Sequence, residues 1–174
     1  PQSVEKEAVT ICWQAPQREY QYFVMEMLNK TSRNSTVESL EIYKYMITEK
    51  SWWDTVDYMA ANLVGNYFKL YPENINDKTS EWMKSGNIWL QRTCLLFQLK
   101  YKKRLDTMLL ENFIFELKDS KEFFIRKAIG WILREYSKTA PDFVIDFVRR
   151  YPLSGLSHRE ALKWMERKGK IASK

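Results

Sequence analysis

The residues best suited to chemistry are a tryptophan and an aspartate four positions apart. Trp53 and Asp57 lie in the segment SWWDTVDYM, and in a helix their side chains would share one face. An indole attracts cations, and a carboxylate beside it stabilises a developing positive charge. The pair could therefore act on a cationic or partly cationic ligand. In the alternative interpretation, Trp53 belongs to the core and Asp57 is a solvated helix charge.

A second tryptophan lies between two cations. In FFIRKAIGWILREY, the residues Lys127, Trp131 and Arg134 are spaced by four and three, so they share a helix face opposite the apolar stripe. An indole in that setting could contact a sugar or a base. It could equally cap the edge of a structural repeat.

Further cations suit a polyanion. Arg92 interrupts the apolar segment NIWLQRTCLLFQLKY, and Lys100, Lys102, Lys103 and Arg104 follow as a dense cluster. Such cations would neutralise phosphates and release counterions, which supplies affinity but no chemistry. The pattern therefore predicts nucleic-acid contacts by Arg92, Lys100, Lys127 and Arg134. The alternative for the cluster is a solvated helix end.

The elements that must position these residues are helices. Apolar residues recur at helical spacing almost throughout, and only 5 Gly and 5 Pro occur among 174 residues. We expect an all-α chain in which Ser51 caps a helix and Pro141 occupies a first turn. The predicted helices are 4–13, 17–31, 36–48, 52–70, 75–85, 87–101, 104–118, 121–137, 140–151 and 157–168.

A period near 35 residues relates some of these helices. An offset of 35 places Leu90 on Ile125, Cys94 on Ile129 and Arg92 on Lys127. Such spacing suggests stacked helix pairs with a continuous core, because one pair cannot bury both of its apolar faces. The period is near that of tetratricopeptide or HEAT-type repeats. We therefore expect a solenoid of antiparallel helix pairs, one domain over 1–174, with a concave face for a ligand.

Composition excludes several classes of function. The net charge of +6 is uneven, with −3 over residues 1–60 and +6 over residues 148–174, which suggests a polyanionic partner or a solvated basic surface. No apolar run is long enough for a membrane span and no signal peptide is expected, so a soluble cytoplasmic protein is predicted. Cys12 and Cys94 form no CxxC pair, so we expect buried cysteines and no metal. His158 is the only histidine, which disfavours histidine-based catalysis.

Four blocks in order resemble the AlkD-like DNA alkylation repair glycosylases. They are SWWDTVD, NIWLQRTCLLFQLKYK, SKEFFIRKAIGWILREYSKT and LSGLSHREALK. The resemblance runs from about Ala8 to Lys168 and implies a HEAT-like helical repeat fold. It also implies a cofactor-free, monofunctional enzyme that hydrolyses the N-glycosidic bond of 3-alkyl and 7-alkyl purines, such as 3-methyladenine and 7-methylguanine, in double-stranded DNA.

By this resemblance, Asp57, Trp53 and Trp131 match the family's catalytic-face aspartate and tryptophans, and Arg92 matches an arginine of the DNA-facing surface. The family is thought to contact the damaged nucleotide from the backbone side without a base pocket. A monomer that acts in base-excision repair is expected.

Two other functions remain open. The chain opens at Pro1 and is expected to lack the family's first helices, as a truncated chain or a short form. A short form could be a catalytically silent HEAT-repeat protein that binds DNA. The third candidate is a protein-interaction solenoid whose tryptophans line a groove. The first two predict salt-dependent affinity for DNA, and the third does not.

Overall fold

The computed structural model describes the backbone of residues 2–172 and the side chains of residues 6–172. All regular secondary structure in these residues is helical, which confirms the predicted all-α class. Contacts divide the chain into two compact units, Pro1–Phe97 and Gln98–Lys174, which we call unit 1 and unit 2. A single domain over 1–174 stays a prediction, and its residues 1, 173 and 174 lie outside the described part.

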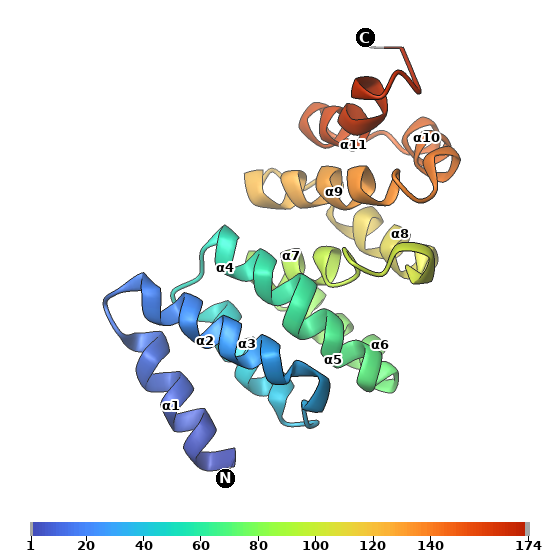
Figure 1. Ribbon diagram of the computed structural model, residues 1–174. Coiled ribbons are helices and arrows are strands. Elements are labelled where there is room, and N and C mark those ends of the chain that lie inside the picture. The colour runs from blue at the N-terminus through green and yellow to red at the C-terminus, as the bar shows by residue number, and fades with distance from the viewer. Residues whose placement is uncertain (1, 173–174) are drawn as a thin grey trace. The chain divides into compact units, whose positions relative to one another are not determined.

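Unit 1 consists of helices joined by short turns (Figure 1). The α-helices are α1 (Gln2–Gln14), α2 (Arg18–Thr31), α3 (Ser39–Thr48), α4 (Trp53–Tyr58), α5 (Gly65–Leu70), α6 (Ile75–Lys84) and α7 (Ile88–Leu96). Two short 3₁₀ turns, η1 (Ser32–Asn34) and η3 (Pro72–Asn74), follow α2 and α5.

Helices α4 and α5 form one continuous helix through a π-helical segment, η2 (Met59–Val64). The predicted helix over 52–70 is therefore confirmed. A π segment widens the turn and changes which side chains face the neighbouring helix, and such segments are common at functional sites. Asp57 lies just before this segment.

Polar contacts in unit 1 repeatedly join residues about one predicted period apart. Trp13 Nε1 donates to the Glu49 carbonyl at 2.8 Å over 36 residues, and Tyr71 Oη donates to the Ser35 carbonyl at 2.9 Å over 36. Lys78 pairs with Glu41 over 37 residues. The core between these contacts contains Trp13, Leu40, Met46, Tyr67, Phe68, Trp82 and Phe97, all at most 2% exposed. Residues one period apart thus occupy adjacent places in this unit.

Unit 2 begins with a 3₁₀ turn, η4 (Lys102–Arg104), and continues with four α-helices (Figure 1). They are α8 (Thr107–Leu117), α9 (Phe123–Tyr136), α10 (Pro141–Arg150) and α11 (Gly155–Arg167). Helix α9 packs closely along α11 because Gly130 leaves room for it. A Cβ at Gly130 would lie 2.4 Å from Glu160 Cβ and 2.9 Å from the Ser157 carbonyl oxygen.

The helix boundaries agree with the sequence prediction except in a few places. Pro141 occupies the first turn of α10 as predicted. Ser51 does not cap α4, because its hydroxyl donates back to the Ile47 carbonyl at 2.6 Å. Helix α7 ends at Leu96 rather than at residue 101. Cys94 is buried as predicted, whereas Cys12 is only half-buried.

Candidate functional site

Asp57 and Arg92 form a buried ion pair in unit 1. Arg92 Nε donates to Asp57 Oδ1 at 2.7 Å, and Nη2 donates to Oδ2 at 2.8 Å. The Asp57 residue is 8% exposed and Arg92 is 4% exposed. This bidentate geometry fixes the carboxylate in position and orientation. The expectation of Asp57 as a solvated helix charge is therefore wrong.

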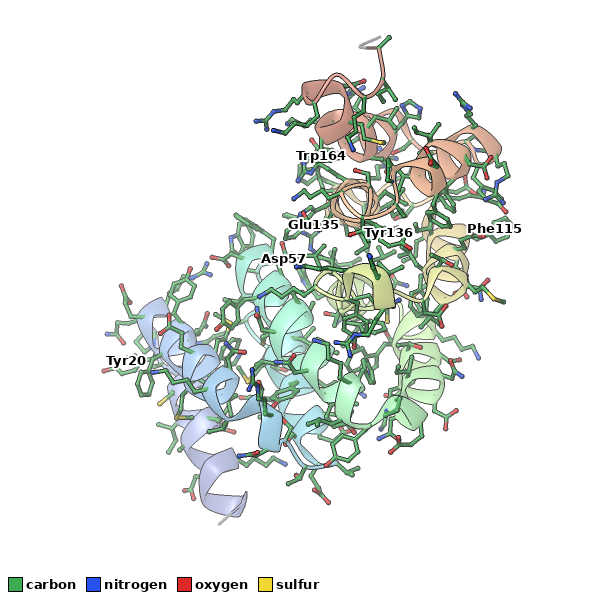
Figure 2. The ribbon with its side chains drawn as sticks, turned by 45° about the vertical axis from the view of Figure 1, so that its right-hand side comes forward. Tyr20, Asp57, Phe115, Glu135, Tyr136 and Trp164 are labelled. Carbon is green, nitrogen blue, oxygen red and sulfur yellow. The ribbon has the colours of Figure 1, made fainter. Side chains whose placement is uncertain are left out.

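The local fold explains how the pair is held. Asp57 lies on the last turn of α4, which packs against α7, the helix that carries Arg92. Close approach to the end of α7 requires a glycine, because a Cβ at Gly65 would lie 2.5 Å from the Phe97 carbonyl oxygen. Figure 2 shows Asp57 on its helix. The carboxylate is thus set into a rigid helical layer.

The environment of Asp57 shifts its proton affinity. Burial raises the pKa of the Asp57 carboxyl above its ordinary value, and the charge of Asp54 raises it further. The hydrogen bonds and charge of Arg92 act in the opposite direction without cancelling the effect. A carboxylate with a raised pKa accepts a proton more readily than an ordinary aspartate.

A second carboxylate, Asp54, lies one turn earlier on α4 and was missed by the sequence analysis. Arg18 Nη2 pairs with Asp54 Oδ1 at 2.8 Å, and Tyr22 Oη donates to Asp54 Oδ2 at 2.6 Å. Partial burial opposes ionisation, but the Tyr22 hydrogen bond and Arg18 hold the pKa of Asp54 below its ordinary value. Arg18 precedes Asp54 by 36 residues, so the repeat period was the signal that could have revealed this contact.

Exposed aromatic side chains lie on α2 and at the start of α4. Trp53 is 46% exposed, so the alternative that placed it in the core is wrong. The others are Tyr20, Tyr22, Phe23 and Trp52, and Tyr20 is labelled in Figure 2. Large exposed aromatics of this kind offer flat faces to a ligand.

The predicted residues of α9 lie in unit 2, where an acid neutralises the two cations. Trp131 is half-buried. Lys127 Nζ lies 3.0 Å from Glu160 Oε1, and Arg134 Nη1 lies 2.6 Å from Glu160 Oε2. The Glu160 side chain is 13% exposed, so α11 holds a fixed carboxylate between the cations. The sequence analysis did not assign a role to Glu160.

Lys100 lies in the turn between α7 and η4. The three cations of η4, Lys102, Lys103 and Arg104, are exposed. Among the described residues, no group of three or more histidine, cysteine or acidic side chains is placed to hold a metal ion. Within the same residues, no helix combines the length and the apolar character required to cross a membrane.

Comparisons with family models and with solved structures both find proteins similar to this chain. A family model described as DNA alkylation repair enzyme matches residues 2–165. A solved structure described as a predicted DNA alkylation repair enzyme from Enterococcus faecalis superposes with a TM-score of 0.87 at 30% sequence identity. The match covers 95% of this chain and 77% of that one. No curated protein matches the chain.

Proposed function

Because the chain belongs to the DNA alkylation repair enzyme family, we propose that it is a DNA glycosylase for positively charged 3-alkyl and 7-alkyl purines in duplex DNA. The observation that carries the proposal is the Asp57 carboxylate, which Arg92 holds in a fixed orientation one helical turn from the exposed Trp53. The family membership confirms the resemblance seen in the four sequence blocks, and it implies a DNA substrate.

The chemistry fits these residues. An alkylated purine carries a positive charge, so it leaves with the electron pair of its N-glycosidic bond and needs no prior protonation. The deoxyribose then develops oxocarbenium character, which a nearby carboxylate stabilises. Water adds to the sugar carbon C1′ and loses a proton. In this proposal Asp57 is the counter-charge and accepts that proton.

Arg92 does not occupy all of the carboxylate. Each Asp57 oxygen has two lone-pair directions, so each accepts one bond from Arg92 and retains capacity for a water molecule. The raised pKa of Asp57 suits a proton acceptor in this role. Arg92 therefore acts in the proposed reaction as a positioning residue for Asp57. From the family resemblance, we also propose that Arg92 contacts DNA.

The exposed indole of Trp53 is proposed to contact the cationic sugar or base. A cation over an indole face gains about 0.5 to 2 kcal/mol, depending on solvation. Trp131 is proposed to do the same from unit 2, and Lys100, Lys127 and Arg134 to contact the DNA backbone. The polar contacts between residues about 35 apart in unit 1 support the proposed HEAT-like stacking.

The direct test is release of free base from methylated duplex DNA. We expect the intact protein to liberate 7-methylguanine or 3-methyladenine, detected by chromatography, and to leave an abasic site. Binding without release would favour the second candidate, a catalytically silent DNA-binding protein of the same family. The observation that favours this candidate is the low exposure of Asp57, which leaves a narrow approach to its carboxylate.

A further inference from the structure

The loop between α7 and α8 concentrates positive charge. We call residues 100–104 the basic loop; four of its five residues are Lys or Arg. Lys102, Lys103 and Arg104 are exposed. Among the carboxylates that the structure describes, none lies within 4.0 Å of these three cations in an ion pair. These three residues therefore present uncompensated positive charge to solvent.

The basic loop is held in one conformation by buried anchors at both ends. Gln98, which is 2% exposed, accepts a bond from Asp106 N at 2.7 Å and donates to the Asp106 carbonyl at 3.3 Å. Leu105 inserts its side chain into the core and is 8% exposed. These contacts tie together the two ends of the segment that carries the cations, so its backbone is anchored before any ligand binds.

Holding the cations in this arrangement is costly in the absence of a ligand. Like charges on neighbouring residues repel each other at distances well within the Debye length of about 8 Å at physiological salt. Lys102 also adopts φ of 54°, in the left-handed region that disfavours side chains other than glycine. An anion at the loop would relieve the repulsion.

An open recess of about 600 Å³ adjoins the basic loop. Residues 100–104 line it together with Lys138 and Thr139, and no carboxylate contributes to its wall. Lys138 follows the end of α9, where Figure 2 labels Glu135 and Tyr136. Lys138 pairs with Glu135 at 2.6 Å. Lys102, Lys103 and Arg104 are lining cations for which the described residues supply no ion-pair partner.

We propose that the basic loop is a second DNA contact that binds successive phosphates of the duplex backbone. The consecutive, exposed cations match a repeating row of charges better than a single small anion, which would require an enclosed site with buried donors. The identity of the polyanion rests on the proposed function, which makes duplex DNA the ligand. The loop belongs to unit 2, whereas Asp57 belongs to unit 1.

The test compares two triple variants of equal net charge. Lys102→Gln, Lys103→Gln and Arg104→Gln together neutralise the loop, and Lys30→Gln, Lys69→Gln and Lys84→Gln together neutralise three exposed cations of unit 1. Binding to an undamaged duplex is measured by fluorescence anisotropy across a salt series. If the loop contacts two or three phosphates, the salt slope of its variant falls by about 2 to 3 and its affinity falls roughly tenfold or more. The control is expected to keep most of the wild-type slope.

Three outcomes would overturn the inference. The first is an unchanged slope in the loop variant, and the second is an equal fall in both variants, which would indicate a general charge effect. The third is a loop variant that no longer binds phosphatidylserine vesicles, which the wild type binds, but still binds duplex DNA like the wild type. That result would indicate that the loop binds a lipid surface. Base release by the wild type is assayed in parallel. If the wild type releases base and the salt slope of the loop variant is unchanged, only the proposal for the loop is rejected. If that slope falls but the wild type releases no base, only the proposed glycosylase activity is rejected.

Discussion

Asp57 and Arg92 lie 35 residues apart in the sequence and form a buried, bidentate ion pair. Arg18 of α2 and Asp54 of α4, which are 36 residues apart, form a second pair. Both pairs join equivalent places in successive parts of unit 1. The repeat that builds the core therefore also supplies each acidic residue of α4 with its arginine.

Removing Arg92 should cost more stability than removing both partners. Arg92→Met leaves the Asp57 carboxylate buried without its cation, and losing one partner of such a pair costs about 3 to 5 kcal/mol. Adding Asp57→Asn to that variant removes the buried charge and should recover part of the loss. Urea unfolding of both variants gives the comparison. The single variant Asp57→Asn is measured as well. If Asp57→Asn lowers the free energy of unfolding by the same amount in the wild type and in Arg92→Met, the two residues are not coupled.

The pH dependence of base release should report the pKa of Asp57, which the charge of Asp54 raises. The proposed base must be ionised, so activity is present above the pKa of Asp57 and is lost as pH falls through it. Asp54 raises that pKa, so Asp54→Asn should move the acidic limb of the single-turnover rate to lower pH. Asp77→Asn removes an exposed carboxylate of α6 and serves as the control. A limb that stays in place, or moves to higher pH, would contradict the assignment of Asp57 as the titrating group.

The packing of α9 on α11 should depend on Gly130. Gly130→Ala places a methyl group within 2.4 Å of Glu160 Cβ and 2.9 Å of a backbone oxygen, so we expect a loss of about 1 to 3 kcal/mol in the free energy of unfolding. Gly155→Ala is the matched control. Its new Cβ meets only the flexible end of Arg159 at 3.4 Å. Equal effects of the two substitutions in thermal melts would show that close helix approach is not the cause.

Glu160 provides a test of the proposed DNA contacts on α9. It neutralises Lys127 and Arg134, so Glu160→Gln should free both cations and tighten duplex binding if they face phosphates. The same change should cost about 1 kcal/mol of stability, because a partly exposed network contributes modestly. Glu166→Gln, on the same helix, changes the net charge equally. Matching affinities for the two variants in an anisotropy titration would remove Lys127 and Arg134 from the DNA contacts.

Much of the architecture follows from the sequence because the helices are long and strongly periodic. Leu90, Cys94, Ile125 and Ile129 align at the 35-residue offset, and all four are at most 3% exposed. Helix ends were less predictable, since they depend on contacts made elsewhere. Helix α7 stops early, and Gln98 instead ties the chain to Asp106, a contact that periodicity does not reveal.

The sequence predicted only part of the candidate site. Spacing placed Trp53 and Asp57 on one helix, but it did not reveal the burial of Asp57 against Arg92. The contact of Glu160 with Lys127 and Arg134 was also missed, because it depends on how α9 packs on α11. Tertiary ion pairs of this kind depend on how the helices pack, which short sequence patterns do not specify.

The central claim is that Asp57 carries the chemistry. The most direct measurement is the single-turnover rate of 7-methylguanine release from methylated duplex DNA, with Asp57→Asn in excess over substrate. Circular dichroism and duplex affinity establish that the variant is folded and binds. The account predicts a rate lower than that of the wild type by about 100-fold or more, with affinity largely retained. Release at the wild-type rate by Asp57→Asn would contradict it.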